Sequence, residues 1–95
     1  MDRSQIERRL DSLPTRPGVY MFRDSSRRIL YVGKAINLRS RVRSYFRESI
    51  TSRKIERMVR EIDDFEITVV ESELEALILE CSLIKTHRPQ YNVKL

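Results

Sequence analysis

The sequence is poor in the residues that build covalent, metal-stabilised or membrane-spanning structures. It has one cysteine, one histidine, two glycines, three prolines and no tryptophan in 95 residues. The lone Cys81 cannot form an internal disulfide, so folding does not depend on an oxidising compartment. One cysteine and one histidine, His87, also make structural zinc and thiol catalysis poor interpretations.

Long apolar runs are missing too. No window approaches the roughly 20 apolar residues of a membrane span, and no charged-then-apolar leader opens the chain. Apolar residues make up 40% of the sequence and charged residues 35%, which is ordinary for a globular chain. We therefore expect one domain over residues 1–95, cytoplasmic, without membrane contact and monomeric in isolation.

Charge is distributed unevenly along the chain. Residues 34–60 carry nine Lys or Arg against two Glu, a net of +7, whereas residues 61–80 carry eight acids and no Lys or Arg. A basic block of this kind attracts a polyanion, of which nucleic acid is the commonest, although a solvated helical face explains it equally well. The acidic stretch argues against simple DNA coating and leaves carboxylates available for capping, solvation or metal binding.

Strands are expected where β-formers are bounded by turn signals. Pro17-Gly18 precedes a strand at about 19–23, a polar turn separates it from a strand at 28–32, and a third is expected at 65–70. Symmetry of the hairpin about the turn would place Tyr20 opposite Tyr31, with Phe22 and Ile29 on the same face and Leu30 on the other. Both faces are apolar, so helices should cover both.

Four helices are expected from caps and apolar spacing. Ser4 to Glu7 fits a capping box for a short helix that ends before Pro14. Asn37 can cap a helix over 38–46, and an amphipathic helix follows Ser52. Ser72 opens a helix to about Lys85 that is apolar on nearly every side and should be the most buried. The sequence predicts an α/β domain: a three-stranded antiparallel sheet flanked by helices.

Glu80 is the most informative single residue. Its helical neighbours at three and four positions are Ala76, Leu77, Leu83 and Ile84, all apolar. A carboxylate in such surroundings is costly unless a cation or hydrogen-bond donors meet it. The pattern favours a functional carboxylate over a structural salt bridge or a bond to a tyrosine.

Gly33-Lys34 does not form a nucleotide cradle. A P-loop needs glycine at position 28, which is Arg, and Ser or Thr at position 35, which is Ala. Arg41 and Arg39 border opposite edges of the same apolar stripe. Helix geometry cannot choose which of them turns toward the sheet, and for either one alone a solvated arginine is the simpler interpretation.

Together these residues resemble a known family. Gly18-Val19-Tyr20 followed by Tyr31-Val32-Gly33 resembles the paired motif of GIY-YIG endonucleases, with Val replacing Ile in both halves. Lys34, Arg41, Tyr45, Glu80 and Asn92 stand where the family's remaining site residues fall. The resemblance covers residues 17–95 and is strongest to the N-terminal nuclease domains of bacterial nucleotide excision repair, so we expect an excised fragment of a longer protein. Arg27-Arg28 in the turn touches no motif.

The resemblance implies metal-dependent hydrolysis of a DNA phosphodiester bond on the 3′ side of a lesion. Glu80 would hold one Mg²⁺ or Mn²⁺, and Tyr31 would be the general base, aided by Lys34 and by Tyr20. Arg41 would bind the phosphate. Lys34 and the neighbouring basic residues Arg39 and Arg43 would also contact the DNA. Gly33 would let substrate backbone approach.

Support residues, partners and alternatives complete these expectations. Tyr45 and Asn92 would support the site through hydrogen bonds. A damage-loading partner protein would bind other regions of the full-length chain, and damaged duplex DNA would be the substrate. A Tyr-to-Lys relay and metal-assisted water remain alternatives for the base. A stand-alone nuclease of the same family and a non-catalytic nucleic-acid-binding module remain alternatives for the function.

Overall fold

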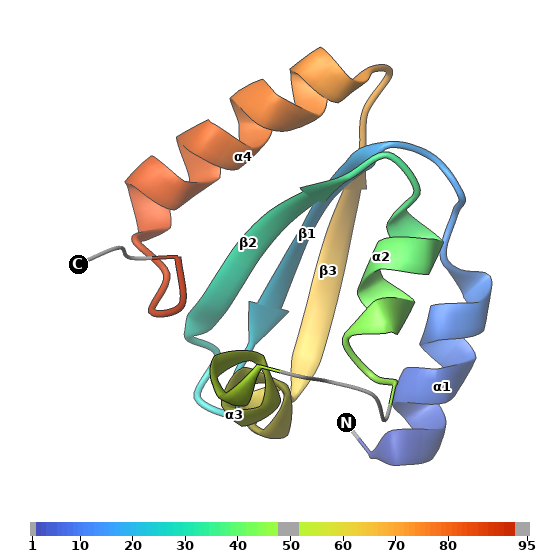
Figure 1. The fold of residues 1–95 in the computed structure, drawn as a ribbon, viewed down its shortest axis with the longest axis vertical. Coiled ribbons are helices and arrows are strands. Elements are labelled where there is room, and N and C mark those ends of the chain that lie inside the picture. Colours follow the sequence, from blue (N-terminus) through green and yellow to red (C-terminus); the bar gives the residue numbers. More distant parts are fainter. Residues whose placement is uncertain (1, 48–51, 93–95) are drawn as a thin grey trace.

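A three-stranded antiparallel sheet forms the centre of the molecule (Figure 1). Strand β1 (Gly18–Arg23) lies between β2 (Ile29–Ala35) and β3 (Asp64–Val69). The helices are α1 (Arg3–Ser12), α2 (Leu38–Ser44), α3 (Arg53–Glu61) and α4 (Glu73–His87). The structure is a computed structural model that describes residues 2–47 and 52–92. The predicted α/β architecture is confirmed.

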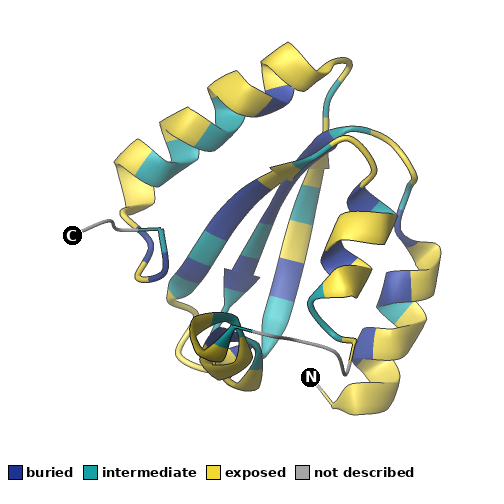
Figure 2. Cartoon of the chain, viewed as in Figure 1, coloured by how far each residue is buried: buried dark blue, intermediate teal, exposed yellow. Residues whose placement is uncertain are grey.

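Helices cover both faces of the sheet, as the two apolar faces predicted. On one face, Tyr20, Phe22 and Leu30 pack with apolar residues of α1, α2 and α3. On the other face, Val19 and Val32 pack with Ala76 and its neighbours on α4. Figure 2 shows buried residues along β1 and β2 and exposed ones on the outer sides of the helices. In the described ranges, no helix is long and apolar enough to cross a membrane.

The hairpin register differs from the symmetric prediction because of a bulge. Tyr31 lies opposite Phe22, and Tyr20 lies opposite Gly33, so the predicted tyrosine pair is wrong. The register shifts between Phe22 and Arg23, where one extra residue of β2 is accommodated. The bulge also exchanges two side chains: Leu30 joins the core beneath α1 to α3, whereas Ile29 packs on the α4 side.

Three of the four predicted helix starts are confirmed by their caps. The side chains of Asn37, Ser52 and Ser72 each accept a backbone N–H from the residue three positions later. The first helix begins earlier than expected. Asp2 is its N-cap and forms a reciprocal capping box with Gln5, so the predicted Ser4 box is wrong.

Helix α4 is less buried than its sequence predicts. Only Ala76 is fully buried on it, whereas Leu74 is 66% exposed, Leu77 42% and Ile78 61%. The prediction that α4 would be the most buried helix is therefore wrong. A single sheet face can cover only one side of a helix, and the contacts of α4 are mainly with β1 and β2.

The free edge of β2 is covered by the residues that follow α4. Arg88 ends the helix in a left-handed conformation, and the chain turns back so that the Tyr91 N–H donates to the Leu30 carbonyl at 2.9 Å. Asn92 then forms two side-chain bonds with Val32. This pairing replaces the partner strand that an edge otherwise lacks and fixes the part of β2 that carries Tyr31.

Candidate active site

Three tyrosines gather where β1, β2 and the end of α2 meet. The hydroxyls of Tyr20 and Tyr45 lie 2.8 Å apart and share a hydrogen bond. Ring centroids are 5.7 Å apart for Tyr20 and Tyr45, 6.3 Å for Tyr31 and Tyr45, and 6.1 Å for Tyr20 and Tyr31. The bulge is what makes this triangle, because it moves Tyr31 opposite Phe22 and leaves the smaller Gly33 opposite Tyr20.

Gly33 makes room for Tyr20. A Cβ built on Gly33 would lie 2.3 Å from the Tyr20 hydroxyl oxygen and 2.4 Å from its ring carbon Cζ. The ring of Tyr20 therefore crosses directly over the glycine on its way to Tyr45. This space is filled by Tyr20, which is 1% exposed, and the expectation that Gly33 lets substrate backbone approach stays a prediction.

The two motif tyrosines differ in how they can handle protons. Burial is the main cause that raises the pKa of Tyr20 far above its usual value, with the Tyr45 hydroxyl adding to the effect. The pKa of Tyr31 is raised to about 12, first by burial, then by Tyr45 and by the Glu80 carboxylate, while Arg41 lowers it. Both are phenols at neutral pH, and only Tyr31 reaches the partly exposed surface.

Glu80 and Arg41 approach Tyr31 from two different helices. Glu80 lies on α4, half-buried, and its charge acts on Tyr31; Arg41 lies on α2, and its charge acts on both Tyr31 and Tyr20. Among the described residues Glu80 has no hydrogen bond and no ion pair. A structural salt bridge, the alternative to a functional role for Glu80, therefore has no partner in this part of the chain.

The structure separates Arg41 from its basic neighbours on α2. Arg39 donates from Nε to the carbonyl of Leu13 at 2.7 Å, and Arg43 pairs with Asp11 of α1 at 2.5 Å. Both therefore turn toward α1, whereas Arg41 turns toward the tyrosines. Helix geometry left open which of Arg39 and Arg41 turns toward the sheet. Arg39 is held by the carbonyl of Leu13, the residue that caps α1, so Arg41 is the one that faces the tyrosines.

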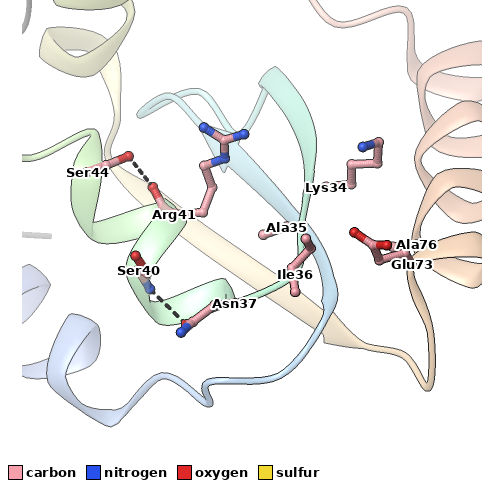
Figure 3. A pocket seen from close by; sticks show the side chains of 9 residues that line it. All are labelled: Lys34, Ala35, Ile36, Asn37, Ser40, Arg41, Ser44, Glu73 and Ala76. Carbon is pink, nitrogen blue, oxygen red and sulfur yellow. Dashed lines mark hydrogen bonds between the residues drawn. The ribbon is translucent and has the colours of Figure 1, made fainter.

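Lys34 and Arg41 line a hollow of about 360 Å³ between the end of β2, α2 and the start of α4 (Figure 3). In the part of the chain that the structure describes, Glu73 is the one carboxylate that lines it, and sequence reasoning did not single it out. Lys34 is exposed and is not among the groups that shift the pKa of Tyr31. Arg41 is the described cation that lowers this pKa, and the role expected for Lys34 beside Tyr31 stays a prediction.

A second hollow of about 340 Å³ lies on the other side of Tyr31 and Tyr45. Among the described residues, Lys54 at the start of α3 is the only charged one that lines it, and Ile55 and Met58 add apolar lining. Sequence reasoning placed Lys54 in the basic block but not at the site. Its position two residues after the cap Ser52 was the available signal.

Asn92 is held as a structural extension of β2. Its Oδ1 accepts the Val32 N–H at 2.8 Å, and its Nδ2 donates to the Val32 carbonyl at 2.9 Å. Val32 lies between Tyr31 and Gly33, so these two bonds fix the strand at the centre of the site. Nearby, the Tyr91 hydroxyl donates to Glu61 of α3, which ties the same segment to that helix.

Fold and site together define a GIY-YIG endonuclease domain. The chain resembles the GIY-YIG N-terminal endonuclease domain of UvrC from Thermotoga maritima bound to its catalytic divalent cation, magnesium, at 41% identity and a TM-score of 0.84 over 98% of this chain and 100% of that one. A point mutant of the same domain matches at 39% identity with a TM-score of 0.86 over 99% and 100% of the two chains.

The family model for the UvrC-like GIY-YIG domain matches residues 16–93. UvrABC system protein C of Caldicellulosiruptor saccharolyticus is 54% identical over 95% of this chain, and that of Gloeobacter violaceus is 53% identical over 99%. The chain therefore belongs to the UvrC-like GIY-YIG domain family. It spans about 15% of the length of these relatives.

Proposed function

We propose that this domain hydrolyses a phosphodiester bond of damaged double-stranded DNA and makes the 3′-side incision of bacterial nucleotide excision repair. The observation that supports this most directly is the meeting of a phenol, a guanidinium and an unpaired carboxylate at one strand. Tyr31, Arg41 and Glu80 come from three different elements, and the charges of Arg41 and Glu80 both act on Tyr31. This combination suits phosphoryl transfer, which needs charge stabilisation and an oriented nucleophile.

Glu80 fits the role of cation ligand. It is half-buried beside Tyr31 and unpaired among the described residues, which also contain no group of three or more His, Cys, Asp or Glu side chains that could hold a metal. Mg²⁺ suits a site with one carboxylate, because it keeps several waters and uses substrate phosphate oxygens as ligands. When bound, Mg²⁺ or Mn²⁺ would supply Lewis acidity at the scissile phosphate. The cation bound in the Thermotoga maritima domain supports this proposal.

Tyr31 would receive the proton of the attacking water. With a pKa of about 12, the phenolate fraction at neutral pH is only roughly 10⁻⁵. Positive charge close to the hydroxyl is therefore required before Tyr31 can act as a base. Arg41 is the described cation whose charge lowers this pKa. A relay to Lys34 and water activated by the cation itself remain alternatives for this step.

The other site residues would hold this arrangement in place. Arg41 would bind a non-bridging phosphate oxygen and stabilise the charge that grows in the transition state. Tyr45 would fix the Tyr31 ring and the Tyr20 hydroxyl, and Tyr20, buried and protonated, can only position its neighbours. Asn92 would keep Tyr31 in register through Val32.

Binding of the DNA on both sides of the cut would use the two hollows. We propose that the hollow with Lys34 and the one with Lys54 receive the strand on opposite sides of Tyr31. Arg39 and Arg43 would contribute through the overall positive potential of α2. A UvrB-like damage-loading protein would bind the longer protein outside this domain, and chromosomal DNA as substrate places the activity in the cytoplasm.

The decisive experiment uses the longer protein, its repair partners and a duplex with one defined lesion. Glu80→Gln should lower 3′ incision by at least about 100-fold, as expected for loss of an electrostatic group that acts at the transition state. Glu71→Gln, an exposed acid paired with Arg16, is the matched control and should stay within about 2-fold. The 5′ incision, which belongs to another domain, should still occur in substrate already cut on the 3′ side. Persistent 3′ incision in the Glu80 variant contradicts the ligand assignment.

A further inference from the structure

Five basic side chains surround a hollow at the turn end of the sheet. Its volume is about 420 Å³, and its lining residues are Arg23, Arg27, Arg28, Ile29, His87, Arg88 and Gln90. We define the four arginines as the hairpin arginine cluster. No carboxylate of residues 2–47 or 52–92 lines this hollow, and the cluster brings together the β1–β2 turn and the end of α4, which are far apart in the sequence.

The arginines of the cluster are not all neutralised by neighbours. Arg23 pairs with Glu66 at 2.5 Å, and Arg28 approaches Asp24 at 3.4 Å. Arg27 and Arg88 have no ion pair with any residue that the structure describes. Guanidinium groups held close together repel one another unless an anion lies between them. The negative end of a helix explains a cation beside α4, namely Arg88, but not the three from the hairpin.

Backbone conformation supplies an independent observation. Arg27 has a φ of 67° and Arg88 a φ of 44°, and these are the only two non-glycine residues with positive φ in the described ranges. Such positions ordinarily hold Gly or Asn, because a Cβ is unfavourable there. At both positions the sequence has arginine, and both arginines line the same hollow. Arginine is therefore unfavourable for stability at both turns, yet both side chains line one hollow. This combination indicates a function for the two side chains.

We infer that the hairpin arginine cluster binds backbone phosphate of the DNA strand that is being cut, beyond the catalytic centre. Ile29 lines the hollow and stands two residues before Tyr31 on β2, about 7 Å along the strand. Gln90, on the other wall, precedes the Tyr91-Asn92 segment that pairs with β2. The cluster therefore lies along the same edge strand as Tyr31, displaced from the site toward the turn end of the hairpin. The inference rests on DNA as the proposed substrate.

Stability and binding should move in opposite directions when the cluster is altered. Arg27→Gly/Arg88→Gly removes two guanidinium groups and relieves both left-handed positions, so the Tm should rise by roughly 2–8 °C. Arg27→Lys/Arg88→Lys keeps both charges. Arg8→Ala/Arg16→Ala removes the same number of positive charges from exposed positions elsewhere and is the matched control.

Binding is measured with the 95-residue chain and a labelled duplex in EDTA, so that no cleavage occurs, at several salt concentrations. The Gly/Gly variant should bind at least about 10-fold more weakly and lose roughly 2 from the slope of log K against log salt. The Lys/Lys variant should retain most of the binding, and the control should change by less than about 3-fold. Equal weakening in the Gly/Gly variant and the control, or none in either, overturns the inference. So does loss of binding to a partner protein with DNA binding unchanged.

The position of the contact is tested with one neutral methylphosphonate placed at successive phosphates around the cut, in the longer protein with its partners. One position should impair wild-type incision, and the same position should have no further effect in the Gly/Gly variant. If wild type does not cut, the proposed function fails while the binding result can still support the cluster. If wild type cuts and the two effects are additive at every position, the cluster assignment fails alone.

Discussion

The packing of the three tyrosines depends on the absence of a side chain at Gly33. Gly33→Ala would place a Cβ 2.3 Å from the Tyr20 hydroxyl oxygen, so the ring of Tyr20 or the strand must move. We expect a loss of about 1–3 kcal/mol in the free energy of unfolding, the usual cost of overpacking a core, and a large loss of incision because Tyr45 loses its partner. Urea denaturation and 3′ incision assays measure these two effects.

Tyr20→Phe is the comparison for that change. It removes only the hydroxyl and its hydrogen bond to Tyr45, so it should cost about 1 kcal/mol. A Gly33→Ala variant that is as stable as wild type would contradict the close approach of Tyr20 to this glycine.

Tyr31 gives the fold a dependence on alkaline pH. Its folded pKa of about 12 lies above the usual value of 10, so the folded state keeps a proton that the unfolded chain releases. The contribution to stability is complete below pH 10 and is lost as the pH rises toward 12. The Tm of wild type should therefore fall steeply in this window, and Tyr31→Phe should make the fall shallower. Equal slopes for the two proteins would contradict the burial of this hydroxyl.

Asn92 shows how a short segment can act as a strand. Its two bonds to Val32 cover the free edge of β2, and removing them leaves a backbone N–H and carbonyl without their partner. Asn92→Ala should cost about 1–3 kcal/mol and should speed hydrogen exchange at the Val32 amide. Gln90→Ala, at an exposed neighbouring position, is the control. Unchanged exchange at Val32 would show that this amide is protected by something other than Asn92.

Helix α4 has one buried side and one exposed side in the structure, although its sequence is apolar on nearly every side. Leu74 and Ile78 are both more than 60% exposed, so replacing either with Ser should change the free energy of unfolding by less than about 0.5 kcal/mol. Val32→Ala, on the sheet face beneath the helix and fully buried, should cost at least about 1–2 kcal/mol. Chemical denaturation of the three variants measures the difference, and a large cost at Leu74 would mean that its side chain is covered in solution.

Local physics explains which features of the elements could be predicted from the sequence. Caps such as Asn37 and Ser52 were predictable because their hydrogen bonds stay within four residues. The hairpin register was not, because the bulge between Phe22 and Arg23 has no glycine to indicate it. The burial of α4 was not predictable either, since an apolar sequence does not show how many partners a helix has.

In the candidate site, too, local features could be predicted from the sequence and long-range features could not. Tyr31 and Glu80 were identified from motif and surroundings, and the structure brings them together. The roles expected for Gly33 and Lys34 stay predictions, because they depend on which side chain fills the space beside Tyr31, a long-range property. The hairpin arginine cluster depends on the turn meeting the end of α4, so no local pattern could reveal it.

The whole molecule is small relative to the DNA interface that specific recognition needs. Specific protein–DNA interfaces bury about 1,000–2,500 Å² of protein surface, and this chain exposes 6608 Å² in total. Its net charge is only +5, and its basic side chains are spread over several places, among them the hollow with Lys34, the hollow with Lys54 and the hairpin arginine cluster. We therefore expect backbone contacts that bring electrostatic affinity without recognition of a lesion.

The 95-residue chain should accordingly bind damaged and undamaged duplexes alike. We expect a Kd of roughly 10⁻⁴–10⁻⁶ M near physiological salt for both, with a steep dependence on salt, and slow cleavage when Mg²⁺ is added. Fluorescence anisotropy with two duplexes that differ only in one lesion measures the ratio of affinities, which should stay below about 3-fold. Lesion-specific cutting by this chain alone, without partners, would mean that the domain itself reads damage; indifference to the lesion means that the longer protein and its partners bring the cut to the damaged site.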